Sequence, residues 1–355
     1  GQDLSVIPAT GGPERILTHY DWSTSVKGIN SPSWSADGKW IYLSVTGDSA
    51  TSLERVPAAG GKRETVFTHP DKGSSHGSID GQVSLFGLVD GPENFSRMGY
   101  VTANGVRGEF TTPSGTSWNR YTIGSPGALL ETHTVPAQLS VLDLANGQVR
   151  DLQGGTDQVK KLVWSGDRKR LAFAADTNIV VANSDGSGQR RFSADRGAVV
   201  TSWAPDGNGV EYIDGAGRTL HALNTTTGVT RTLASVPSPS LIWNGPKWQP
   251  DGKSFLLLTV TSANGFPSNS AVVEFRLDGS RHVVRDLSKE FLSATKSDSI
   301  EEVSLLSNRS ALVGLSDPDA QRFVVVPVDG GAHRSLPLVP WDRANRASGA
   351  IMAQS

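Results

Sequence analysis

A short motif recurs along this chain and limits what it can fold into. It reads SWSADGKWIYLS from Ser33, VWSGDRKRLAFAA from Val163, SWAPDGNGVEYI from Ser202 and KWQPDGKSFLLLT from Lys247, with a weaker copy, HGSIDGQVSLFGL, from His76. In each copy two apolar runs flank an Asp-Gly or related turn, which is the signature of a β-hairpin. A hairpin repeated at intervals of this kind indicates a repeat architecture.

A second hairpin, with a glycine in its turn, follows each copy of the motif. These glycines are separated by 39 to 51 residues. Two hairpins in each repeat give four strands, and four strands in a repeat of about 45 residues predict a blade of a β-propeller. The turn glycines are Gly11, Gly60, Gly105, Gly147, Gly186, Gly228, Gly279 and Gly330.

The two ends of the sequence complement each other in this pattern. The hairpin around Gly11 has no inner hairpin before it, and residues 341–355 are predicted as strand, turn and strand. We therefore predict a single all-β domain over residues 1–355. It is an eight-bladed β-propeller of four-stranded blades, closed by pairing of the N- and C-terminal hairpins, which removes open strand edges. Seven blades with a loose terminal hairpin is the alternative.

The repeated motif resembles that of a known family. Residues 34–39 (WSADGK), 203–207 (WAPDG) and 248–253 (WQPDGK) look like the "WSPDGK" repeat of TolB-type, WD40-like propellers. The same repeat occurs in the propeller domains of prolyl-oligopeptidase-like hydrolases. The resemblance covers nearly the whole chain, with degenerate copies over 106–147 and 280–330. It implies the fold and leaves the function open, because the family includes scaffolds, partner-binding proteins, substrate gates and some enzymes.

Composition narrows the classes of function. The net charge is −2, so no overall positive field attracts nucleic acid. No apolar run approaches the roughly 20 residues of a membrane span. The absence of cysteine excludes disulfides and thiolate chemistry. Together with few methionines and abundant Ser, Thr, Gly and Asp, it favours a periplasmic or secreted protein, which we expect to be a monomer.

Connection lengths indicate where a ligand would bind. We number the strands of each blade 1 to 4 from the inside outward. In a propeller the turns between strands 1 and 2 and between strands 3 and 4 lie at one end of the ring. The connections between strands 2 and 3, and from strand 4 to strand 1 of the next blade, lie at the other end. The longer connections here, 19–30, 69–75, 90–97, 235–244, 261–270 and 286–299, all belong to the second set. Long loops gathered on one face mark a binding face. The predicted ligand-binding residues are His19, Trp22, Arg97, Trp118, Asn119, Trp243, Lys247, Trp341 and Arg343.

Four residues at this end are candidate metal ligands. His19 and Asp21 occupy positions equivalent to His69 and Asp71 in the next repeat, and imidazole and carboxylate groups bind divalent cations. Asp side chains also cap turns by local hydrogen bonds, so the same repeat fits a structural role. We expect no cofactor, with a divalent cation in the funnel as the alternative.

Two functions from different classes fit these observations. The first is an exported module that binds a small molecule, an oligosaccharide or a protein partner on its loop-rich face without catalysis. The second is a lyase or cyclising enzyme with its site in the central funnel, acting on an acidic sugar. Its catalytic candidates are His76, Arg120, Tyr121 and His133, because such chemistry needs a His or Tyr base and an Arg stabiliser. No Gly-x-Ser-x-Gly nucleophile elbow is present, and we favour binding.

Overall fold

The computed structural model describes the greater part of the chain. The described residues are 2–6, 8, 13–21, 26–35, 37–48, 50–69, 75–79, 83–88, 97–102, 107–111, 118–123, 127–132, 139–143, 149–152, 161–263, 266–292, 299–306, 309–316, 320–336 and 339–340. These residues are almost entirely β-strands, with one short helix, α1 (Leu287–Phe291).

Seven antiparallel sheets of four or five strands follow one another along the described chain. The first contains β3 (Val26–Trp34), β4 (Trp40–Gly47), β5 (Thr51–Pro57) and β6 (Glu64–His69). The second contains β7 (Ser75–Ile79), β8 (Val83–Leu88), β9 (Arg97–Thr102) and β10 (Arg107–Thr111). The third contains β11 (Trp118–Ile123), β12 (Gly127–Thr132), β13 (Leu139–Asp143) and β14 (Val149–Leu152). The fourth contains β15 (Leu162–Trp164), β16 (Arg170–Ala175), β17 (Asn178–Asn183) and β18 (Arg190–Ser193).

The later sheets depart from the simple four-stranded form. The fifth contains β19 (Val199–Trp203), β20 (Gly209–Ile213), β21 (Thr219–Asn224) and β22 (Thr230–Ser235). In the sixth, the first strand is split into β23 (Leu241–Ile242) and β24 (Lys247–Trp248), followed by β25 (Ser254–Ala263), β26 (Phe266–Arg276) and β27 (Arg281–Asp286). The seventh contains β28 (Ser299–Leu305), β29 (Ser310–Ser316) and β30 (Ala320–Pro327), and its last strand is split into β31 (Arg334–Ser335) and β32 (Val339–Pro340).

The predicted hairpins are confirmed as the units of these sheets. SWSADGKWIYLS forms the end of β3, a turn and most of β4, with Trp34 opposite Ile41. In the turn, the Asp37 carboxylate accepts hydrogen bonds from the Ser35 hydroxyl at 2.7 Å and the Lys39 amide at 3.1 Å. Gly38 has a φ of +67°, a conformation that glycine adopts without a Cβ penalty. The Asp-Gly dipeptide therefore fixes the turn of this inner hairpin.

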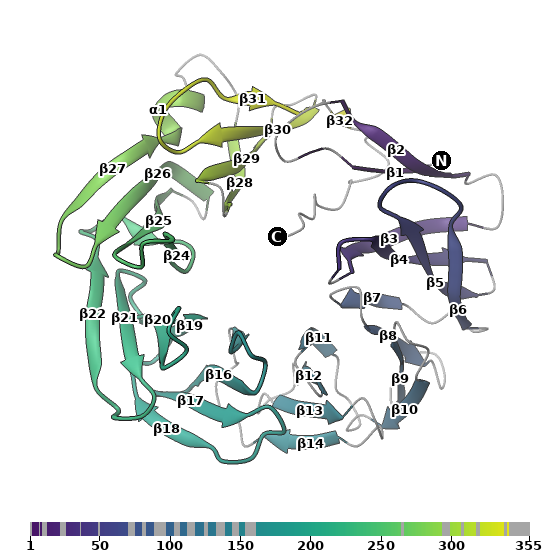
Figure 1. The fold of residues 1–355 in the computed structure, drawn as a ribbon, viewed down its shortest axis with the longest axis horizontal. Helices are drawn as coiled ribbons and strands as arrows, with labels where there is room; N and C mark the ends of the chain where they lie inside the picture. Colours follow the sequence, from purple (N-terminus) through teal and green to yellow (C-terminus); the bar gives the residue numbers. More distant parts are fainter. Residues whose placement is uncertain are drawn as a thin grey trace.

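The sheets are arranged in a ring (Figure 1), as a β-propeller requires. First strands such as β3, β7, β11 and β19 lie nearest the middle, and last strands such as β6, β18 and β22 lie on the rim. Apolar clusters fill the spaces between successive sheets. One joins Phe255 and Phe275 of the sixth sheet to Ile213 and Leu220 of the fifth. The ring is thus held by cores between blades rather than by one central core.

Arginine side chains also tie some outer strands to the next sheet. Arg190 of β18 donates to the Thr225 carbonyl at 2.6 Å, and Arg285 of β27 donates to the Gly331 carbonyl at 3.0 Å. In both cases the acceptor lies in the 3–4 turn of the following sheet. We call these contacts the forward arginine contacts.

The N-terminal strands form a separate pair that fits the same scheme. β1 (Gln2–Val6) and β2 (Arg15–Tyr20) make a two-stranded sheet. Arg15 of β2 donates to the Ala58 carbonyl at 2.6 Å, in the 3–4 turn of the first sheet. β2 therefore contacts the first sheet through an arginine in the same way as β18 contacts the fifth sheet. The predicted C-terminal hairpin, 341–355, lies outside the described residues.

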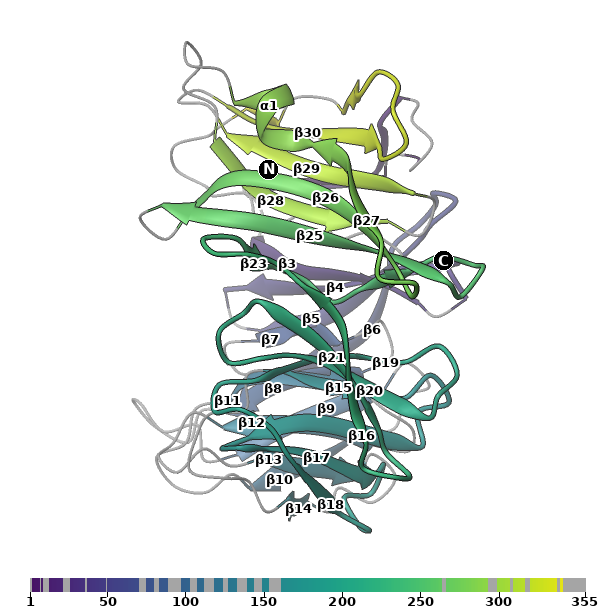
Figure 2. The ribbon, with the colours of Figure 1, turned by 90° about the vertical axis from the view of Figure 1, so that its left-hand side faces the viewer.

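Three segments that were predicted as long connections differ from that expectation. Residues 26–30 belong to β3, and residues 261–263 and 266–270 extend β25 and β26 beyond the neighbouring strands. Residues 287–291 form α1, where the Asp286 side chain caps the helix by accepting from the Lys289 amide at 2.9 Å. Figure 2 shows α1 and the tip of the β25–β26 hairpin projecting at the same side of the ring.

Candidate functional site

The first strand of the sixth sheet is interrupted by a bulge. Leu241 and Ile242 pair with Val260 and Thr259, and pairing resumes at Lys247 with Leu256. Four residues, 243–246, therefore stand opposite only Leu257 and Leu258 of β25. We call residues 243–246 the Trp243 bulge. Bulges occur next to binding sites because they redirect side chains out of the sheet.

The Trp243 bulge presents an indole to solvent. Trp243 is 50% exposed, although its amide still donates to the Leu258 carbonyl at 2.9 Å. Its position lies on a first strand, and Figure 1 shows β24, which follows the bulge, on the inner side of β25. An exposed indole on the inner layer of a rigid ring offers a large contact surface that is already fixed in place.

The bulge is held by the first strands on both sides. A Cβ on Gly245 would lie 2.7 Å from the Cβ of Thr201 in β19, so only glycine fits this approach. The Asn244 side chain reaches the other way and donates to the Val303 carbonyl of β28 at 3.4 Å. The bulge thus spans the inner layer from the fifth to the seventh sheet.

Lys161 meets the same inner layer from the fourth sheet. It directly precedes β15, and its Nζ donates to the Thr201 carbonyl at 3.2 Å. The side chain is accessible to water, yet burial of the ammonium group among protein atoms lowers the pKa of Lys161. Lys161 and Gly245 therefore both contact Thr201, from opposite sides.

A buried carboxyl group lies beside this cluster. Glu211 of β20 accepts hydrogen bonds from the Ser202 hydroxyl at 2.6 Å and from the Trp248 indole at 2.7 Å. Its side chain has no solvent exposure, and burial raises the pKa of Glu211 to about 7. Because it is enclosed, this carboxyl joins the fifth and sixth sheets rather than meeting a ligand.

The structure separates several of the predicted site residues. His19 lies in β2, and its Nδ1 is 2.6 Å from an Asp3 carboxylate oxygen. Asp21 follows β2 and is exposed, and His69 ends β6 opposite Thr51. The described part of the chain holds no group of three or more His, Cys, Asp or Glu residues able to share a metal ion.

The other predicted residues are placed only in part. His76 pairs with Leu85 in β7, and Arg120 and Tyr121 pair with Glu131 and Leu130 in β11, so these three lie on first strands of neighbouring sheets. Trp118 and Asn119 also belong to β11, Arg97 begins β9, and Lys247 begins β24. Trp22, Asp71, His133, Trp341 and Arg343 lie outside the described residues.

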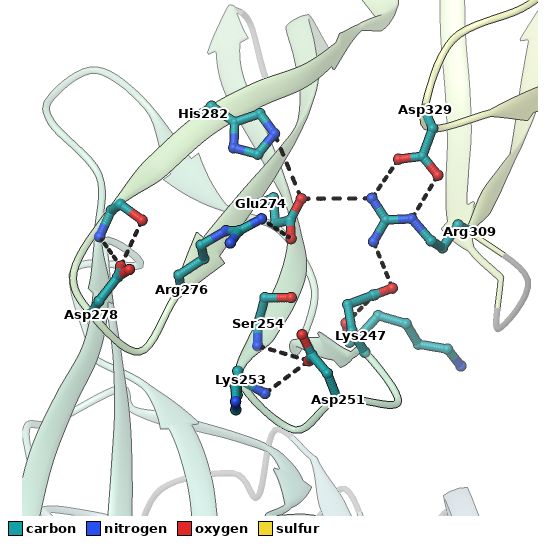
Figure 3. A network of polar contacts seen from close by, with 12 residues as sticks. Lys247, Asp251, Lys253, Ser254, Glu274, Arg276, Asp278, His282, Arg309 and Asp329 are labelled. Carbon is teal, nitrogen blue, oxygen red and sulfur yellow. Dashed lines mark hydrogen bonds and ion pairs between the residues drawn. The ribbon is translucent and has the colours of Figure 1, made fainter.

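A charged network of a different kind lies near the turns of the sixth and seventh sheets (Figure 3). Glu274 lies 3.6 Å from His282 Nε2 and 3.6 Å from Arg309 Nη2. Arg309 also pairs with Asp329 and donates to the Gln249 side chain at 2.6 Å. These cations already have carboxylate partners within the protein, so this network joins the sixth and seventh sheets.

Sequence reasoning found Trp243 and missed Lys161, Thr201 and Glu211. Lys161 stands two residues before the Val-Trp of its repeat, where the first strand begins. Its position at the start of a first strand could have identified Lys161 as a residue of the inner layer. The contact of Thr201 with Gly245 has no local signal, because it joins residues of different sheets.

Comparison with known proteins supports the fold. No family model matches the sequence, and no curated protein matches it. Among solved structures, the chain is similar to dihydro-heme d1 dehydrogenase NirN in complex with DHE, with a TM-score of 0.54 and 14% identity, covering 92% of this chain and 68% of that one. This likeness shows a β-propeller fold and no activity.

Two further structures are more distantly similar. One is a putative TolB from Agrobacterium tumefaciens, with a TM-score of 0.41 and 16% identity over 66% of this chain and 85% of that one. The other is an oligogalacturonate lyase in complex with manganese, with a TM-score of 0.46 and 15% identity over 80% of this chain and 84% of that one.

Proposed function

We propose that this protein is a β-propeller module that binds a ligand at the inner layer of its ring, against the Trp243 bulge. The observation that carries the proposal is the bulge itself. It breaks the pairing of a first strand and leaves an indole 50% exposed there. The strand loses pairing at the point where it exposes an aromatic side chain on a rigid scaffold. This arrangement fits a binding role.

The ligand proposed for this site contains a ring with an apolar face, such as a saccharide. An indole binds such a face by stacking, and neighbouring backbone and amide groups supply polar contacts. Asn244 and Thr201 provide such groups within the same cluster. No contact among the described residues favours the lyase hypothesis over binding.

The proposal is tested by saturation-transfer NMR with cellobiose, maltose and chitobiose. We expect transfer to at least one of these sugars in the wild type and its loss in Trp243→Ala. The matched control is Val283→Ala, which removes another exposed apolar side chain, 61% exposed, on the outer strand β27. Sugar signals that persist in Trp243→Ala, or that disappear equally in Val283→Ala, contradict the proposal.

The proposal also concerns the compartment in which the module acts. We propose that the module acts outside the cytoplasm, which is supported by the absence of cysteine and the Ser-, Thr- and Gly-rich composition. In the described part of the chain, no helix has the length and apolar character needed to cross a membrane.

We also propose that the ring contains eight blades. The contact of Arg15 with the turn of the first sheet supports this proposal, because it gives β1 and β2 the place of an outer hairpin. Residues 341–355 would then supply the inner hairpin of that blade.

A further inference from the structure

Lys161 brings a positive charge to the inner layer beside the Trp243 bulge. Its Nζ lies 3.2 Å from the Thr201 carbonyl, and the Cβ of Thr201 is the atom against which Gly245 packs. Trp243 is two residues before Gly245. The ammonium group and the bulge that carries the indole therefore both contact Thr201, and they lie on the inner layer of three consecutive sheets.

The charge of Lys161 is not balanced within the described residues. A lysine ammonium has three donors, and the one described partner is a neutral carbonyl. Among the described residues, burial is the cause that lowers the pKa of Lys161. By contrast, Arg309 at the other end of the ring pairs with both Asp329 and Glu274. An accessible cation that has no counter-charge among the described residues is available to bind an anionic ligand.

The surroundings of Lys161 suit a carboxylate better than a phosphate. Phosphate sites in proteins usually add a helix N-terminus, a nest of backbone amides or an arginine fork to the lysine. The described residues around Thr201 are strands, and Lys161 is the cation that contacts them. A single ammonium matches a single negative charge.

We propose that Lys161 is the anion-recognition residue of this site, so that the ligand is an acidic saccharide whose ring stacks on Trp243 and whose carboxylate meets Lys161. This inference rests on the proposed function, because it needs a saccharide at the Trp243 bulge. It adds the charge of the ligand and the residue that recognises it.

Isothermal titration calorimetry with two matched disaccharides tests this inference. Cellobiouronic acid and cellobiose differ by one carboxylate. We expect the wild type to bind the acid about tenfold more tightly at low salt, and added salt to reduce the difference. Lys161→Met keeps the aliphatic stem and should remove the preference for the acid, so that the two sugars bind with equal affinity. Lys161→Arg should retain a preference.

The control is Lys253→Met, which removes an exposed cation from the Asp251 turn at the opposite end of the ring. We expect this variant to bind both sugars as the wild type does. Equal affinity of the wild type for the two sugars, binding of neither, or an acid preference that survives in Lys161→Met overturns the inference. Trp243→Ala separates the two proposals: if it abolishes cellobiose binding while the acid preference is absent, the binding site stands and only the role of Lys161 fails.

Discussion

Glu211 shows how one buried side chain can make the stability of this protein depend on pH. Its carboxyl group receives hydrogen bonds from Ser202 and Trp248, yet burial dominates and raises its pKa from 4.5 to about 7. The folded state therefore holds the proton more tightly than the unfolded chain. The resulting stability is fully present below pH 4.5 and is lost as the pH rises through 7.

We predict that Glu211→Gln flattens the pH dependence of stability between pH 4.5 and 7. The shift corresponds to roughly 3 kcal/mol in the free energy of unfolding. Urea unfolding of both proteins at several pH values measures the difference. Asp278→Asn is the control, because the pKa of this exposed carboxyl is lowered and its titration lies below that window. An unchanged pH profile in Glu211→Gln would show that the carboxyl is not the cause.

Single residues also show what the sequence could and could not predict. The Asp-Gly pairs gave the correct inner hairpins, because turn chemistry is local and Gly38, Gly207 and Gly252 all adopt positive φ. Arg168 occupies the same turn position with a φ of +56°, so the hairpin forms there without glycine. The burial of Glu211 was not predictable, since its partner Trp248 lies 37 residues away on another sheet.

At the scale of elements, the sixth sheet differs from the others in its broken first strand. The connection lengths predict that residues 235–244 link two blades, whereas β23 already pairs with β25 at Leu241 and Ile242. A strand of two residues is too short to show hydrophobic periodicity in the sequence. The register of β25 decides where the bulge falls, and that register depends on pairing with β26 rather than on the local sequence.

We predict that Gly245→Ala destabilises the protein by roughly 1–3 kcal/mol, as overpacking does in a filled interior. The new Cβ would lie 2.7 Å from the Thr201 Cβ, so one of the two segments would have to shift. Gly166→Ala is the matched control, because a Cβ there meets nothing within 4 Å. Thermal melting of both variants measures the effect. Equal melting temperatures would mean that the bulge shifts at little cost.

At the scale of the whole molecule, the question is how the ring closes. The period of the turn glycines predicted the seven described sheets, because each repeat is an independent hairpin pair. The closure was predicted from the unpaired ends and stays a prediction, because β1 and β2 pair only with each other among the described residues. Closure joins residues at opposite ends of the chain, so no local pattern can establish it.

We predict that deletion of residues 348–355 lowers the melting temperature by about 5 °C or more, because in an eight-bladed ring these residues would supply the inner strand that covers the edge of β1. Ser5→Pro in β1 should also destabilise the protein. If the two segments belong to one blade, the combined change should cost less than the sum of the separate changes. Unchanged melting after the deletion, or strict additivity, contradicts the eight-bladed closure.

The forward arginine contacts bear on whether this ring could form from a chain that begins in a different blade. Arg15, Arg190 and Arg285 each donate to carbonyl groups in the 3–4 turn of the following sheet. The cohesion between neighbours is therefore carried by side chains. A circular permutant with new ends in the exposed turn after β17 would retain all three contacts, so the same ring can be built from a chain that starts in a different blade.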